Sequence, residues 1–225
     1  MSGSAGARPW QASTGRVEAF SDGVFAIAIT LLVLDLRAPQ ARGRFGHDLL
    51  AEWPTYLSYV AAFVMIGSVW LHHHLVFARV RRVDLGTVLR NLVLLLAASV
   101  LPFPTAVLSS AWRLGGRGDR VVAALLFGGL SLGISLAYLA LCEHLARHQE
   151  LLADPAAPGF LSGERRRGLI AIAGTLVAAL LAFVSPLLAL VLFAVTPAFY
   201  LTTLPRTVEA DAPTEDDAAA LPSAE

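Results

Sequence analysis

The polar side chains of the first apolar segment are the residues best placed to do chemistry in this sequence. Residues 16–36 read RVEAFSDGVFAIAITLLVLDL, which is long enough to enter a bilayer, yet Arg16, Ser21 and Asp22 stand at its start. An Asp at the centre of a membrane helix costs roughly 2.5–3.5 kcal/mol on insertion scales. An acid in such a segment therefore indicates a specific task for it.

Residues 70–77, WLHHHLVF, bring three consecutive histidines into a second apolar segment. Four of these residues share one helix face through i, i+3, i+4 and i+7 spacing: Trp70, His73, His74 and Phe77. Adjacent helical residues point about 100° apart, so three histidines in a row cannot all bind one ion. No carboxylate or Cys four residues on completes a ligand set, and we predict no metal site.

We favour polar packing over metal binding as the role of these histidines. We expect His73 or His74 to hydrogen-bond Asp22 or Asn91, since such partners relieve the cost of burying each group. A proton relay is the other chemistry that Asp and His allow, but it needs titratable groups across the whole membrane. Here these groups lie mainly in one half, and the middle of residues 16–36 is apolar.

No enzyme signature is present. The sequence has no nucleophile elbow with a Ser-His-Asp order, no phosphate loop and no HExxH motif. We therefore predict a protein that is not an enzyme and has no cofactor. The formal net charge is zero, so net charge indicates no nucleic-acid partner.

Composition defines the elements that must position these side chains. Of the 225 residues 56% are hydrophobic and only 15% are charged, which is typical of an all-α membrane protein. Six candidate spans of about 20 apolar residues follow the chain: 17–36, 55–78, 86–109, 121–144, 168–185 and 187–204. The last two are separated at Ser185-Pro186, because Pro cannot continue the hydrogen-bond ladder. One long tilted helix with an interfacial piece is the alternative.

Arginine distribution orients these spans. All 17 basic residues are Arg, and in a six-span topology one side holds eleven of them together with both termini. We expect this side to be cytoplasmic. The richer side holds Arg8, Arg16, Arg79, Arg81, Arg82, Arg90, Arg147, Arg165, Arg166, Arg167 and Arg206.

Three regions follow along the chain. Residues 1–15 are a polar N-terminus without the apolar core of a signal peptide, and 16–205 form the membrane domain. Residues 206–225 are acidic and rich in Ala and Pro, and we expect them to be disordered. The single Cys142 excludes an intrachain disulfide.

A helical wheel divides the first span into two faces. The stripe of Phe20, Ile27 and Leu34, flanked by Thr30 and Leu31, points away from Asp22. If Asp22 is buried against neighbouring helices, the stripe is free to face lipid, another helix or a symmetry axis.

Three blocks of this sequence resemble the prokaryotic transmembrane protein 175 family, the relatives of the lysosomal potassium channel. The R-x-x-x-F-S-D block is Arg16, Phe20, Ser21 and Asp22, and the following GVFAIAITLLVLDL continues the match. WLHHHLVF (70–77) is similar to the family's W-x-x-H-H-x-x-F segment, and residues 91–105 are similar to its third helix. His72 stands where many relatives have Asn.

The resemblance implies a passive cation channel selective for potassium over sodium. It implies six helices per chain, a homotetramer in the lipid bilayer of a prokaryotic cell membrane, and a central pore lined by the first helix of each subunit. Counted from F-S-D, the apolar constriction falls on Ile27, with Leu31 or Thr30 and Leu34 one and two turns beyond. A structural polar network is implied for Arg16, Phe20, Ser21, Asp22, Trp70, His73, His74 and Asn91.

Two other function classes stay open beside the channel. A proton-coupled secondary transporter could use Asp22 and the histidines, although neither internal repeats nor broken midplane helices are evident. A membrane scaffold without transport is the third class.

Overall fold

A computed structural model describes residues 13–36, 38 and 43–202 of the chain. Most of the predicted polar N-terminus (1–15) and all of the acidic tail (206–225) lie outside the described residues. Within the described part the structure is helical, and its one strand-like feature is an isolated bridge between Val80 and Leu152.

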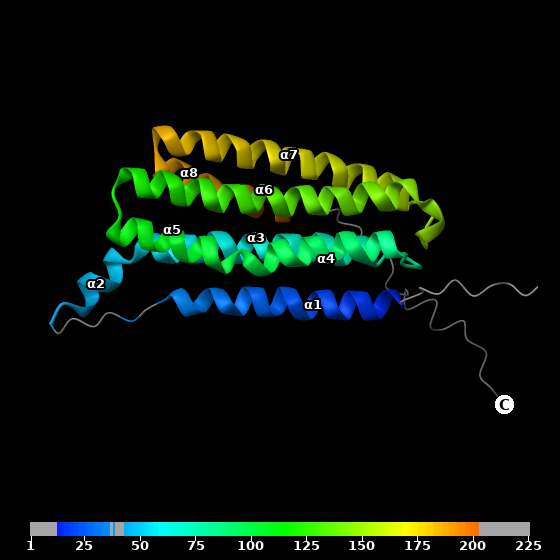
Figure 1. The fold of residues 1–225 in the computed structure, drawn as a ribbon, viewed down its shortest axis with the longest axis horizontal. Helices are drawn as coiled ribbons and strands as arrows, with labels where there is room; N and C mark the ends of the chain where they lie inside the picture. The colour runs from blue at the N-terminus through cyan, green and yellow to red at the C-terminus, as the bar shows by residue number, and fades with distance from the viewer. Residues whose placement is uncertain (1–12, 37, 39–42, 203–225) are drawn as a thin grey trace, which may run out of the picture.

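Each long helical segment runs opposite to the one before it, with α4 and α5 forming one such segment (Figure 1). In chain order the helices are α1 (Thr14–Leu31), the 3-10 turn η1 (Leu32–Asp35), α2 (Phe45–Ala51), α3 (Trp53–Phe77), α4 (Leu85–Val100), α5 (Pro102–Leu114), α6 (Arg117–Arg147), η2 (Gln149–Leu151), α7 (Ala157–Val184) and α8 (Pro186–Thr202).

Five helical segments of the described chain are long and apolar enough to cross a membrane. They are Thr14–Asp35, Trp53–Phe77, Leu85–Leu114, Arg117–Arg147 and Ala157–Val184. They correspond to the first five predicted spans. The sixth predicted span corresponds to α8, which is apolar but has 17 residues and is shorter than the others.

Proline stands at two of the helix boundaries, and the one at Pro186 was predicted from the sequence. Pro102 begins α5 directly after the end of α4, and the two helices run nearly in line (Figure 1). Pro186 begins α8 after Ser185, whose extended backbone ends α7. Because α8 folds back and packs against α7, the alternative of one long tilted helix is wrong.

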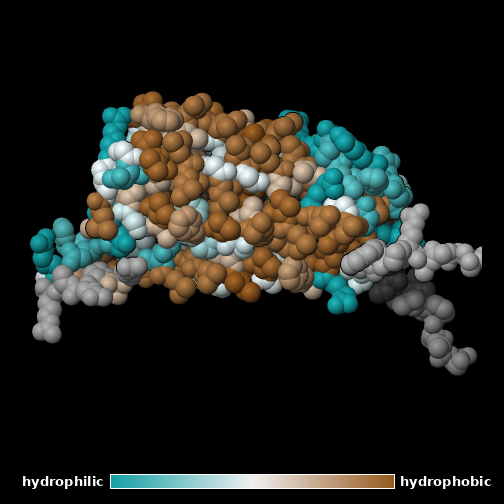
Figure 2. Space-filling model, in the orientation of Figure 1, coloured by the Kyte–Doolittle hydropathy of each residue, from teal (hydrophilic) through white to brown (hydrophobic). Residues whose placement is uncertain are grey.

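The bundle has the first helix on one side and the seventh on the other. Helix α1 contacts α3, α4 and α5, whereas α7 packs on α6 and α8 (Figure 1). Large apolar side chains fill the space between them, among them Phe25, Ile66 and Phe127. Figure 2 shows the result as an apolar belt with hydrophilic residues gathered at the two ends, which suits a bilayer.

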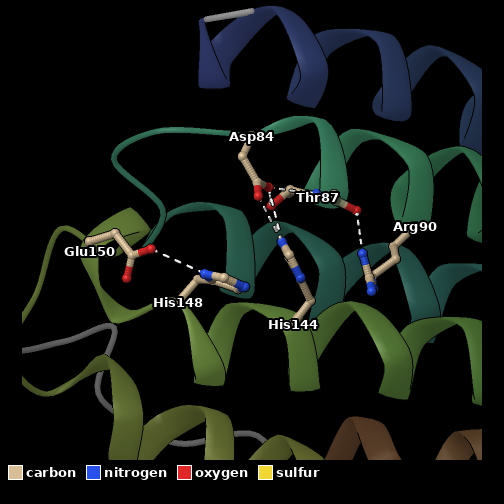
Figure 3. Close-up of polar contacts among 7 residues, drawn as sticks. Asp84, Thr87, Arg90, His144, His148 and Glu150 are labelled. Atoms are coloured by element: carbon tan, nitrogen blue, oxygen red, sulfur yellow. Dashed lines mark hydrogen bonds and ion pairs between the residues drawn. The ribbon is translucent and has the colours of Figure 1, made fainter. Parts of the chain in front are cut away.

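The α3–α4 and α6–α7 loops are joined at one end of the bundle. The amide N of Arg81 donates to the carbonyl O of Leu151 at 2.8 Å, and the amide N of Ala153 donates to that of Arg79 at 2.9 Å. Asp84 caps α4 by accepting from the Thr87 amide at 2.7 Å, and it contacts the His144 ring at 3.0 Å (Figure 3). These bonds tie the start of α4 to the end of α6.

Asp84 is an acid kept ionised by this arrangement. Burial opposes its charge, but the hydrogen bonds from the Thr87 hydroxyl and amide, with the His144 contact, hold the pKa of Asp84 well below its usual range. A lowered pKa in the folded protein contributes stability at neutral pH that is lost only as the pH falls through that pKa. The loop connection therefore persists through mildly acidic conditions.

Candidate functional site

Helix α1 is packed on one face and bare on the other. Ser21, Phe25, Ala28 and Leu32 recur every three or four residues and are buried against the bundle. On the opposite face Ile27 is 61% exposed and Leu34 is 72% exposed. The wheel predicted this division, and the structure places Asp22 and the apolar stripe on different sides.

A chain of three buried side chains anchors the packed face. The Asn91 amide Nδ2 donates to the Ser21 hydroxyl at 2.9 Å, and the Asn91 Oδ1 lies 2.9 Å from His73 Nε2. The Ser21 hydroxyl donates in turn to the Val17 carbonyl at 2.8 Å. Ser21, from α1, is thereby joined through α4 to α3, and the predicted bond between a histidine and Asn91 is confirmed.

Aromatic contacts hold His73 in place. Its ring stacks on Phe77 with centroids 4.3 Å apart, and the Phe25 ring meets it edge-on at 5.4 Å. Phe25 comes from α1, so the same histidine contacts α1 by packing and reaches it through Asn91 by hydrogen bonds.

Two further bonds join α1 to α3 at the edge of this contact. The Trp70 indole N–H donates to Asp22 Oδ1 at 2.8 Å, and His74 Nδ1 lies 2.9 Å from Glu18 Oε1. Asp22 therefore takes Trp70 rather than a histidine as its partner. Glu18 is a participant that the sequence analysis missed, although its place one turn before Asp22 was a usable signal.

Two residues of the predicted polar network, Arg16 and Phe20, do not join it among the residues that the structure describes. Arg16 is exposed, and no side-chain hydrogen bond or ion pair of Arg16 is found among the described residues. Phe20 is 57% exposed, because it lies on the same face as Ile27 rather than on the packed face with Ser21.

The exposed stripe carries no charge. Ile27, Leu31 and Leu34 present alkyl side chains, and Thr30 lies beside them. The Thr30 hydroxyl donates to the Ile27 carbonyl at 2.9 Å, which leaves the oxygen able to accept. The stripe is therefore apolar, with the Thr30 oxygen beside it as an acceptor.

A second polar group lies on the other side of α3, and the sequence analysis did not find it. The carboxylate of Glu164, on α7, is fully buried; it accepts from the Tyr138 hydroxyl at 2.7 Å and pairs with Arg167. His72 Nδ1 lies 3.0 Å from the same carboxylate. Glu164 stands next to three arginines in the sequence, so nothing in its surroundings distinguished it from a solvated flank.

These side chains border a cavity of about 90 Å³ among α3, α6, α7 and α8. Its walls are mainly apolar and include Phe127 and Phe193, with the hydroxyls of Ser68, Ser131 and Thr175 among them. A space of this size holds several waters, which suits polar groups buried at its end.

The histidine triplet therefore reaches three different helices. His72 faces α7, His73 faces α4, and His74 faces α1. This divergence follows from the 100° step between adjacent helical residues. Among the residues that the structure describes, no three His, Cys, Asp or Glu side chains converge so that they could hold a metal ion.

Comparison with known proteins shows which family this sequence resembles. Residues 16–102 match the family model described as endosomal/lysosomal potassium channel TMEM175. The chain is 47% identical over 146 residues to a potassium channel of Streptomyces collinus, which covers 63% of this chain and 68% of that protein. It is 40% identical over 152 residues to a potassium channel of Chamaesiphon minutus. This match covers 66% of this chain and 73% of that protein.

A solved structure is similar as well. The crystal structure of a lysosomal potassium-selective channel TMEM175 homolog from Chamaesiphon minutus superposes with a TM-score of 0.73. Its sequence identity is 33%, and the match covers 84% of this chain and 96% of that one.

Proposed function

The chain belongs to the TMEM175 family of potassium channels, and on this premise we propose that it is a passive, potassium-permeable channel with a pore lined by α1. Four copies of the chain assemble around an axis, and α8 serves as a sixth, short span. Both termini lie in the cytoplasm, on the arginine-rich side of the cell membrane.

One observation carries this proposal. The face that bears Ile27 and Leu31 on α1 and Leu34 on η1 is bare, although the opposite face of α1 is held by buried hydrogen bonds. Holding a helix in a fixed rotation is useful when its free face has a defined task. An axis through that face would bring four copies of Ile27 together.

Such a ring conducts through an apolar constriction. A narrow hydrophobic passage gates by losing its water, and ions pass when the ring widens enough to stay hydrated. Potassium loses its hydration shell at lower cost than sodium, so a narrow apolar passage favours potassium. The acceptor oxygens of Thr30 lie beside Ile27 and supply polar contacts near the ring.

Replacing Ile27 tests the position of the constriction. Ile27→Asn places four amides in the ring, and we expect higher conductance and a lower potassium-to-sodium permeability ratio in planar bilayers. Leu180→Asn is the matched control, because Leu180 is 68% exposed on α7, far from α1. Unchanged permeability in Ile27→Asn would remove Ile27 from the constriction.

Flux measurements separate the three function classes. Purified protein in liposomes with a potassium gradient should pass potassium down its electrochemical potential without a proton gradient. Flux strictly coupled to protons would indicate a transporter, and no flux would indicate a scaffold. The transporter is disfavoured because the intramembrane acids and histidines described above gather toward one end of the bundle.

A further inference from the structure

The outer face of α7 changes from basic to apolar within three turns. Six exposed residues line one shallow depression on this face, at i, i+3, i+4, i+7, i+8 and i+11: Ser162, Arg165, Arg166, Leu169, Ile170 and Ala173. The polar members lie toward the start of the helix and the apolar members toward the middle. This order matches the order of groups in a phospholipid, with its charged head and its hydrocarbon chains.

The basic end of this face has excess positive charge. Arg165 pairs with Glu143 of α6 at 2.8 Å, and Arg147 pairs with the same carboxylate at 2.9 Å. No ion pair of Arg166 is found in the described part of the chain. One carboxylate thus stands against three exposed guanidinium groups, because Glu164 and Arg167 turn inward to their own network.

The apolar end of the face contains a hollow. Ala173 is exposed between larger neighbours on the same helix, Leu169, Ile170 and Val177. A methyl side chain among longer ones leaves a depression that an acyl chain can fill. Further exposed apolar residues, Leu176 and Leu180, continue the face toward the other end of α7.

The location of α7 supports contact with lipid. Helix α7 lies on the side of the bundle away from α1, packed on α6 and α8 (Figure 1). If α1 faces the pore axis, as proposed above, α7 lies at the periphery. Figure 2 shows hydrophilic residues meeting the apolar belt at the end of the bundle where α7 begins, the depth of a headgroup.

We propose that this face of α7 binds an anionic phospholipid from the leaflet on the arginine-rich side. The lipid phosphate lies between Arg165 and Arg166, where guanidinium groups form paired hydrogen bonds to phosphate oxygens. One acyl chain lies along Leu169 and Ile170 and fills the hollow at Ala173. Free phosphate would use only the basic end, whereas the lipid uses both. The assignment to lipid rests on the proposed pore role of α1.

Native mass spectrometry of the detergent-purified full-length protein tests this site without measuring flux. Phosphatidylglycerol and phosphatidylcholine of identical chains are added in separate titrations, and we expect tighter retention of phosphatidylglycerol. Each surface arginine contributes about 1 kcal/mol to attraction of anionic lipid, so Arg165→Gln with Arg166→Gln should weaken its binding about thirty-fold.

Matched variants distinguish lipid binding at this site from a general effect of the protein's net charge. The double variant Arg81→Gln, Arg82→Gln removes two exposed arginines from the α3–α4 loop and changes the net charge equally. It should keep phosphatidylglycerol within about two-fold of the unmodified protein. Ala173→Leu fills the hollow and should weaken lipid binding several-fold with every arginine intact.

Three results would overturn the assignment. They are equal retention of the two lipids, equal losses from the two double variants, or displacement of the lipid by millimolar inorganic phosphate with no effect of Ala173→Leu. Potassium flux of the same variants in liposomes is recorded separately. A protein that binds the lipid but passes no potassium would contradict the proposed function and leave the lipid site standing.

Discussion

Helix α3 carries a polar network on each side near its C-terminal end, and the two networks are built from different chemistry. Toward α1 and α4 the contacts are mainly hydrogen bonds of Ser21, Asn91 and His73, with acids only at the edge. Toward α6 and α7 a buried carboxylate, Glu164, is surrounded by Tyr138, His72 and Arg167.

This difference indicates that the polar networks on the two sides of α3 have different structural roles. A neutral hydrogen bond contributes about 1 kcal/mol net, so the α1 side is held by several modest bonds that can be exchanged. A buried ion is tolerated only when its partners are complete, so the α7 side has little freedom. We infer that α3, α6, α7 and α8 form a frame that depends on the Glu164 network, and that the hydrogen bonds on the other side of α3 set the rotation of α1 on this frame.

The largest expected effect comes from breaking the charged network. Glu164→Ala leaves His72, Tyr138 and Arg167 without their common partner, and removing one member of a buried ion pair costs about 3–5 kcal/mol. We expect a strongly lowered melting temperature in detergent, or loss of folded protein on size exclusion.

Two controls accompany Glu164→Ala. Glu164→Gln keeps an acceptor for Tyr138 and should be less damaging, and Glu143→Ala removes a more exposed acid and should cost at most about 1 kcal/mol. If Glu164→Ala melts with the unmodified protein, the frame does not depend on this carboxylate.

A smaller effect is expected from the neutral network. Asn91→Ala removes the hydrogen bonds to Ser21 and His73 and leaves the buried His73 Nε2 without its partner, while Ser21 keeps its bond to the Val17 carbonyl, at a cost of about 1–3 kcal/mol. The protein should still fold, but potassium flux per folded molecule should change, because the rotation of α1 is no longer held.

Helix α4 offers a control for this variant. Ser99→Ala removes an exposed hydroxyl that bonds only within the helix, to the Leu96 carbonyl, and should change neither stability nor flux. Flux in Asn91→Ala equal to that of Ser99→Ala would mean that the network does not position the pore face.

The smallest effect is expected at the edge of the α1 contact. Asp22→Ala removes the acceptor of the Trp70 indole, which is partly exposed and can turn to water, so the loss should be about 1 kcal/mol. Impaired assembly should appear as a smaller fraction of the proposed tetramer on size exclusion, and Asp22→Asn should restore most of that fraction. A well-assembled, normally conducting Asp22→Ala channel would rule out an anchoring role.

Much of this arrangement is local in origin and could be predicted. The spans follow from apolar runs, and the breaks at Pro102 and Pro186 follow from the missing amide hydrogen. The two faces of α1 follow from helical periodicity, and the His73–Asn91 bond from the need to pair buried polar groups.

Other features depend on contacts between residues distant in sequence. Asp22 and His74 each had several suitable partners, and only the packing of α1 on α3 assigned Trp70 to one and Glu18 to the other. His72 meets Glu164, 92 positions further along the chain, where α3 lies against α7. No local pattern marks such a pair.

The sequence by itself determined where the membrane-length helices lie, that the chain breaks at Ser185-Pro186 and which residues share a face, because these depend on apolar runs, on proline and on the period of one helix. The tertiary structure decided which polar group meets which partner and which apolar face stays bare. Those choices depend on how separate helices pack, and Ile27 and Phe25 of α1 are equally apolar until a neighbouring helix covers one of them.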